Sequence, residues 1–136
     1  MKRQLFVLLG IGLLLATASA YAQTIQIKAD IPFNFVVGKT ALPSGEYKIR
    51  SLNMNQVLSI GGSGQNSIMF LANTCSSPRP SAQTKLVFTR YGDRYFLSQV
   101  WIEGNSTGRQ LPKSRGEVRV AENETAQPVV VLAELR

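Results

Sequence analysis

One short stretch of the chain combines side chains that could hold a ligand. Two arginines and two tyrosines surround a Gly-Asp pair, and a tryptophan follows further along the same stretch. Guanidinium groups clamp anions, and aromatic rings stack against sugars or bases. We therefore select five candidate ligand-binding residues: Arg90, Tyr91, Arg94, Tyr95 and Trp101. The alternative interpretation is that the Arg and Tyr side chains pack against each other across the end of a hairpin.

The residue types that catalysis most often needs are scarce. The sequence contains no histidine and a single cysteine, which removes the Ser-His and Cys-His nucleophile pairs and the usual zinc ligands. The eight acidic residues form no spaced calcium-binding motif, although carboxylates far apart in sequence can still pair in a glycosidase. We predict no catalytic residue, no metal site and no cofactor, and expect the protein not to be an enzyme.

The single cysteine, Cys75, lies in a stretch rich in Ser and Pro. With no second cysteine, an intramolecular disulfide is impossible. A lone cysteine in an exported protein either pairs between chains or stays a free thiol, and we expect an unpaired thiol without a role.

Residues 1–22 have the three parts of a secretory signal peptide. Two positive residues precede an apolar run at residues 5–15, and small residues at 18–20 and 20–22 satisfy the cleavage rule. We place cleavage after Ala22. The apolar run is too short for an ordinary membrane span. We expect an exported protein, periplasmic or extracellular, with no stable membrane span after signal cleavage.

The chain is basic. It has 15 Lys and Arg against 8 Asp and Glu, and removing the signal peptide leaves a net charge of +5. A basic exported protein is attracted to anionic polymers of the envelope. The charges are scattered rather than gathered in a run, which argues against nucleic acid and also fits an ordinary solvated surface. The partners we expect are envelope polysaccharide or further copies of the chain.

Residues 23–136 are long enough for one domain with one core, and we predict a single β-rich domain. Short β-prone runs recur between turn signals, which is typical of an antiparallel sandwich or barrel. We predict strands at residues 24–29, 46–52, 56–60, 67–72 and 129–133. The expected fold is all-β: a single antiparallel β-sandwich or barrel-like domain of about seven to eight strands, with at most one short helix near 110–122.

Residues 85–103 form the central hairpin of this prediction, with Gly92 and Asp93 as its turn. The turn places Arg90 opposite Tyr95, and the two faces follow by alternation. One face then carries Leu86, Phe88, Tyr95, Leu97 and Trp101, and the other carries Val87, Thr89, Phe96, Val100 and Ile102. Because both faces are apolar, we expect a helix or loop over the outer one. The alternative is that one face is an interaction surface.

Two further segments have less regular patterns. Residues 73–84 contain two prolines and are predicted to be the longest loop. Residues 113–122 are predicted to be either a helix or a strand. Pro112 suits the first turn of a helix, whereas Gly116 and the alternating Val118 and Val120 favour a strand.

Several motifs together resemble a group of small secreted bacterial proteins that is common in acidobacteria. They are ADIPFNF at residues 29–35, LPSGEY at 42–47, RYGDRYFL at 90–97 and GRQLPKSR at 108–115. The similarity covers roughly residues 29–120. The resemblance implies export from a bacterium and carries over no activity.

Export, small size and the missing catalytic residue types favour a non-enzymatic structural or interaction protein of the bacterial cell envelope or extracellular matrix. The alternative is a β-sandwich module that binds a glycan or anionic polymer through the five candidate residues. A third hypothesis is assembly by strand exchange, in which residues 24–29 pair with the sheet edge of a neighbouring copy.

Overall fold

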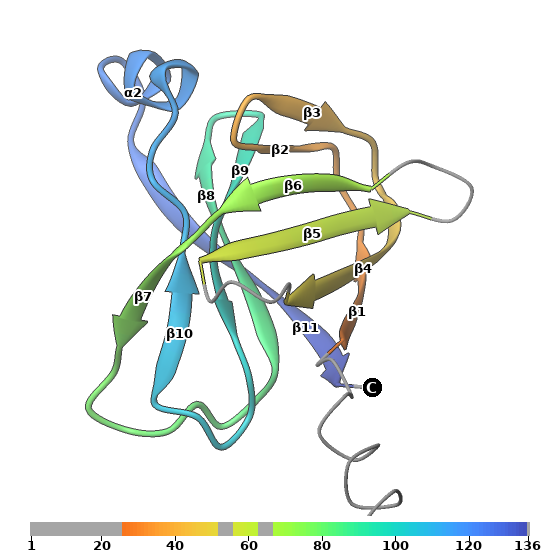
Figure 1. The fold of residues 1–136 in the computed structure, drawn as a ribbon. Coiled ribbons are helices and arrows are strands. Elements are labelled where there is room, and N and C mark those ends of the chain that lie inside the picture. Colours follow the sequence, from red (N-terminus) through yellow and green to blue (C-terminus); the bar gives the residue numbers. More distant parts are fainter. Residues whose placement is uncertain (1–25, 52–55, 63–66, 136) are drawn as a thin grey trace, which may run out of the picture.

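The structure is a computed structural model that describes residues 26–51, 56–62 and 67–135 (Figure 1). Within these residues there are eleven strands and one short helix. They are β1 Gln26–Ile31, β2 Phe35–Val37, β3 Thr40–Leu42, β4 Gly45–Ser51, β5 Val57–Gly62, β6 Ile68–Leu71, β7 Asn73–Ser76, β8 Lys85–Tyr91, β9 Arg94–Trp101, β10 Thr107–Gln110, α2 Arg115–Ala121 and β11 Ala126–Leu135. The predicted signal peptide lies outside the described residues.

The strands form a sheet that curls into a half-barrel, which confirms the predicted all-β, barrel-like class. The strand order is β3-β2-β9-β8-β11-β1-β4-β5-β6, and β10 joins it by pairing with β9 and β7. Figure 1 shows β5 and β6 crossing in front of β8 and β9. The pairs are antiparallel apart from one parallel contact of β2 with β9, at Val36 and Phe96.

The described strands outnumber the predicted seven or eight because several are very short. Strands β3, β7 and β10 have three or four residues each, with few alternating apolar side chains. Two of them fall in segments that looked like loops. Strand β7 occupies the start of the predicted loop at 73–84, so that prediction was wrong for Asn73–Ser76.

The inward side chains of the strands meet in one core cluster. In β4, Tyr47 and Ile49 are buried between exposed neighbours, as alternation predicts. Phe35 of β2 lies between the two halves of the curled sheet. Its ring makes edge-to-face contacts with Tyr47, at 5.1 Å between centroids, and with Phe88 of β8, at 5.5 Å. These contacts hold the short β2 strand firmly against the core.

The central hairpin of β8 and β9 begins as predicted. Gly92 has a φ of 60°, which a two-residue hairpin turn requires. Tyr91 lies opposite Arg94, Arg90 opposite Tyr95, and Phe88 opposite Leu97. The turn residues therefore fixed the register of this end of the hairpin.

Further from the turn, a bulge reverses the predicted faces. The register shifts between Val87 and Phe88, because Ser98 is an extra residue on β9. Val100 now lies opposite Leu86 in the core, while Trp101 lies opposite Lys85 on the outer face. The predicted placement of Trp101 with Leu86, and of Val100 and Ile102 on the outer face, was therefore wrong.

A helix covers the outer face of the hairpin at the turn end. There Tyr91 is buried against α2, and its ring meets the ring of Phe96 edge-on at 5.7 Å between centroids. At the other end, Trp101 packs on Gly108 of β10, the neighbouring strand of the same sheet. On the strand β11, Val130 and Leu132 lie opposite Val87 and Lys85 and are 51% and 58% exposed. The predicted cover over the outer face is thus present at the turn end, where it is the helix α2.

Residues 113–122, for which the sequence left helix and strand open, contain the helix α2. Ser114 is its N-cap, and the Ser114 hydroxyl accepts a hydrogen bond of 3.2 Å from the Glu117 backbone N–H. Such a cap supplies a hydrogen-bond acceptor to a backbone N–H of the first turn, which has no acceptor within the helix. Pro112 precedes the cap instead of lying in the first turn. The cap outweighs the low helix propensity of Gly116 and the two valines.

Candidate functional site

The five candidate residues do not form one site. Trp101 lies at the far end of the hairpin from the Gly92 turn, opposite Lys85. Its ring is buried, and a Cβ added to Gly108 would lie 2.7 Å from that ring. The indole N–H donates a hydrogen bond of 2.9 Å to Gln99 Oε1. Trp101 is therefore a packing residue that holds β10 against β9.

Tyr91 is also internal. Its side chain is 2% exposed, and its hydroxyl donates a 2.8 Å hydrogen bond to Glu117 Oε2 of α2. Burial, followed by the hydrogen bond and the negative charge of Glu117, raises the pKa of Tyr91 to about 12. Ionising Tyr91 would place two negative oxygens side by side in a buried contact. This hydrogen bond fixes α2 against the turn of the hairpin.

Arg90 and Tyr95 pack against each other across the strands, which was the alternative interpretation of the sequence. The Arg90 guanidinium lies 5.6 Å from the centre of the Tyr95 ring, and Arg90 Nε donates to the Gly92 carbonyl at 2.7 Å. The Tyr95 ring also stacks on Phe33, with 3.8 Å between centroids. The half-buried Tyr95 ring is thus in contact with two side chains of the protein itself.

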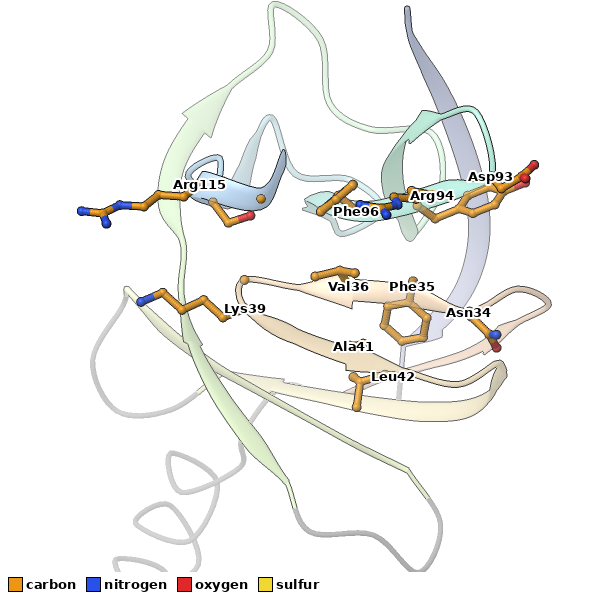
Figure 2. A pocket seen from close by; sticks show the side chains of 14 residues that line it. Asn34, Phe35, Val36, Lys39, Ala41, Leu42, Asp93, Arg94, Phe96 and Arg115 are labelled. Carbon is orange, nitrogen blue, oxygen red and sulfur yellow. The ribbon is translucent and has the colours of Figure 1, made fainter. Parts of the chain in front are cut away.

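Arg94 is the candidate that remains available. Its exposed side chain borders an open groove of about 510 Å³ between the β2–β3 hairpin, the β8–β9 turn and the start of α2 (Figure 2). The lining residues are Asn34, Phe35, Val36, Gly38, Lys39, Ala41, Leu42, Asp93, Arg94, Tyr95, Phe96, Ser114, Arg115 and Gly116. The groove is therefore built from three segments that are far apart in the sequence.

Each wall of the groove has a physical anchor. Gly38, with a φ of 61°, makes the β2–β3 turn that carries Lys39 to the rim. Asn34 Oδ1 accepts a 2.9 Å hydrogen bond from the Ser44 backbone N–H and so fixes the chain on both sides of this hairpin. The opposite wall depends on α2, which the Tyr91–Glu117 hydrogen bond holds in place.

Three cations, one from each wall segment, border the groove: Lys39, Arg94 and Arg115. In the view of Figure 2, Lys39 and Arg115 extend toward the same end of the groove, Arg94 is drawn beside Phe96, and Asp93 lies at the opposite end. Within the described residues, no ion pair joins these three cations to an acidic side chain. The apolar side chains of Val36, Leu42 and Phe96 lie between them.

Sequence reasoning found one residue of this rim and missed the other two. Arg115 lay in a segment of undecided structure, and nothing along the chain linked it or Lys39 to Arg94. One usable signal was present. Ser114 followed by Glu117 is the spacing of a helix N-terminal capping box, which would have favoured the helix that brings Arg115 to the groove.

Other reactive groups lie outside the groove. Within the described residues, no cluster of three or more His, Cys, Asp or Glu side chains could hold a metal ion. Cys75 of β7 is a half-buried free thiol, and burial raises its pKa. In the part of the chain that the structure describes, no helix has the length and apolar character that crossing a membrane requires.

Comparison with protein-family models, with curated proteins and with solved structures finds no match for this chain.

Proposed function

We propose that this chain is an exported interaction protein that binds an anionic polysaccharide in the groove of Lys39, Arg94 and Arg115. The observation that carries the proposal is the arrangement of these three cations, which come from separate segments yet border one largely apolar groove. The site differs from the predicted one, because only Arg94 and Tyr95 of the five candidates line it, and Arg94 is the one cation among them.

The chemistry of the groove suits an acidic sugar chain. A sugar ring presents an apolar face of C–H groups, which can pack on the half-buried side chains of Val36 and Leu42. Carboxylate or sulfate groups on the same chain would meet the guanidinium groups of Arg94 and Arg115, whose paired N–H groups match such anions. The net charge of +5 that remains after removal of the signal peptide adds a long-range attraction to anionic polymers.

Binding without catalysis is favoured by what the groove contains. Asp93 is the single carboxylate among its lining residues. Hydrolysis of a glycosidic bond in most enzymes requires two carboxyl groups on either side of the bond. A polysaccharide would therefore be held and not cleaved.

Segments that carry the resemblance to small secreted bacterial proteins also line the groove, although the resemblance itself carries over no activity. Three of the segments that carry it, around residues 29–35, 90–97 and 108–115, each contribute lining residues to the groove. Export rests on the signal peptide pattern at residues 1–22. A periplasmic or extracellular location would expose the groove to envelope polysaccharide.

The test compares two triple variants that remove the same charge. Lys39→Ala with Arg94→Ala and Arg115→Ala removes the three rim cations. Lys48→Ala with Arg50→Ala and Arg79→Ala removes three exposed cations that do not line the groove. Binding to a uronic-acid polysaccharide and to a neutral glucan is measured by calorimetry at low and moderate salt.

We expect the rim variant to lose about tenfold or more in affinity for the acidic polysaccharide, since three surface charges contribute about 0.5–1 kcal/mol each. The control variant should bind nearly as well as the wild type, and added salt should weaken binding in both. Equal losses in the two variants would mean a general charge effect and no groove site. Release of shorter sugar chains, abolished by Asp93→Asn, would show an enzyme instead.

A further inference from the structure

Three described strands, β3, β6 and β7, are paired on one side only, and β6 alone among them has large apolar side chains that are exposed. Strand β6 pairs with β5, and within the described residues no other strand pairs with it. Two of its four side chains, Met69 and Leu71, are 72% and 63% exposed on the outer face. Ile68 and Phe70 point inward to the core. A sheet edge with apolar outward side chains is a ready site for another strand.

The hydrogen-bonding direction of β6 can be worked out from one contact. The Ala72 backbone N–H donates to the Gln56 carbonyl at 2.8 Å. In an antiparallel ladder the hydrogen-bonded positions alternate, so Phe70 and Ile68 also direct their backbone groups to β5. The backbone N–H and C=O of Met69 and Leu71 therefore point to the open side of the edge.

The edge strand β3 has the protection that β6 lacks, and the third edge strand, β7, has the polar sequence NTCS. Strand β3 is three residues long, Lys39 precedes it and Pro43 follows it. Charged residues, proline and short length are the usual means by which proteins prevent pairing at an edge. By contrast, residues 51–78, which include β5, β6 and β7, contain no charged side chain at all.

The missing charge also indicates what pairs with β6. Without its signal peptide the chain carries a net charge of +5, so two copies repel each other over most of their surface. The uncharged edge is the place where two copies can meet without that repulsion. A partner of opposite charge would gain no electrostatic attraction from an uncharged edge. A second copy has the same net charge, so it needs an uncharged edge in order to pair.

We propose that β6 pairs antiparallel with β6 of a second copy of this chain, about a two-fold axis at Phe70. In this register Met69 of each copy lies opposite Leu71 of the other, and both positions have outward backbone groups. Each such pair exchanges two backbone hydrogen bonds. The exposed Met69 and Leu71 side chains then lie side by side on one face of a continuous sheet, where they shield each other from water.

This assembly replaces the predicted strand exchange through residues 24–29. Strand β1, which includes most of that segment, is paired with β11 on one side and β4 on the other. It has no free edge to offer a neighbour. The dimer is also separate from the proposed polysaccharide site, since β6 contributes no residue to that groove.

The experiment measures the solution mass of the exported protein by light scattering over a dilution series. We expect a mass of about twofold that of one chain for the wild type. Leu71→Lys puts a charge on the shared edge and should give the mass of one chain. The matched control is Leu132→Lys, which has a similar exposure of 58% but lies on β11, a strand paired on both sides. It should keep the doubled mass.

A second variant tests the backbone contact directly. Met69→Pro removes an N–H that points away from β5, so the β5–β6 ladder is retained while the contact between copies is lost. Circular dichroism verifies the fold of each variant, and hydrogen exchange of the Met69 and Leu71 amides should accelerate on dilution. A single-chain mass for the wild type, a doubled mass for Leu71→Lys, or growth beyond two copies would each overturn the proposal.

Discussion

The two ends of the β8–β9 hairpin bury an aromatic ring on the same outer face by different means. At the turn end, Tyr91 reaches α2 through one hydrogen bond to a buried carboxylate. At the far end, Trp101 meets β10 through close contact with a glycine that has no side chain to displace. The attachment of α2 depends on the protonation of Tyr91. The attachment of β10 depends on the close fit of the Trp101 ring against the glycine. We expect the groove wall formed by α2 to respond to pH and the β10 attachment not to.

The largest loss of stability should come from changes at the Trp101 end of the hairpin. Trp101→Ala removes a buried ring and should lower the free energy of unfolding by about 3–5 kcal/mol. Gly108→Ala places a Cβ against the ring and should cost about 1–3 kcal/mol. In the double variant the clash disappears, so Gly108→Ala should add little to Trp101→Ala. Chemical denaturation of the four proteins measures the coupling, and strict additivity would contradict the packing between these two residues.

Changes at the turn end, where Tyr91 bonds to Glu117, should cause the next largest loss of stability. Tyr91→Phe keeps the ring but leaves the buried Glu117 carboxylate without its donor, which should cost about 2–3 kcal/mol because the acceptor is charged. Glu117→Gln retains an acceptor and should cost less. Denaturation curves give both values, and hydrogen exchange should show the loss concentrated in α2. An unchanged α2 in Tyr91→Phe would mean that packing of Phe96 alone holds the helix.

Alkaline pH should weaken the same end without any mutation. The pKa of Tyr91 is about 12 in the folded protein against 10.0 for an ordinary tyrosine. Because the folded value is higher, the contribution is complete below pH 10 and is lost as the pH rises from 10 to 12. At about pH 11 the loss should be about 1.4 kcal/mol.

The measurement for this pH effect is a set of denaturation curves between pH 9 and 12. Burial also raises the pKa of Tyr47 and of Cys75, so the wild type loses stability from these groups as well. The difference between wild type and Tyr91→Phe isolates the contribution of Tyr91. Parallel pH profiles for the two proteins would rule that contribution out.

The smallest effect should come from Arg90. Arg90→Ala removes a cation placed over the exposed side of the Tyr95 ring and should cost about 0.5–1 kcal/mol. Arg90→Lys should retain part of it. Neither change should alter polysaccharide binding, because Arg90 does not line the groove. If Arg90→Ala lost polysaccharide binding while Arg94 was intact, the binding site would lie at the tip of the β8–β9 hairpin.

Local sequence signals predicted the regions where one turn controls the structure. The Gly92 turn gave the opposite pairs of Arg90 with Tyr95 and Phe88 with Leu97, and alternation in β4 gave the buried Tyr47. The bulge at Ser98 was not predictable in this way, because one extra residue leaves no mark in a run that is apolar on both faces. It moved Trp101 to the outer face and separated it from the other candidates.

The candidate site was less predictable than the fold. Tyr91, Tyr95 and Trp101 were selected for chemistry that exposed aromatic rings perform, yet each ring is in contact with the protein itself. Exposure depends on where α2 and β10 lie, and neither position is encoded near the rings in the chain. Lys39 and Arg115 join Arg94 only through the tertiary fold, so no spacing along the sequence reveals them.

The first and last described strands are neighbours in the middle of the sheet. Residues 27–29 of β1 pair with residues 133–135 of β11, and β11 also pairs with β8. The two halves of the strand order are therefore joined through the pairing of β1 with β11. Because this pairing closes a loop from about residue 29 to residue 133, folding should be slow and should finish only once these two distant strands have met. We expect this arrangement to affect the rate of refolding more than the free energy of unfolding.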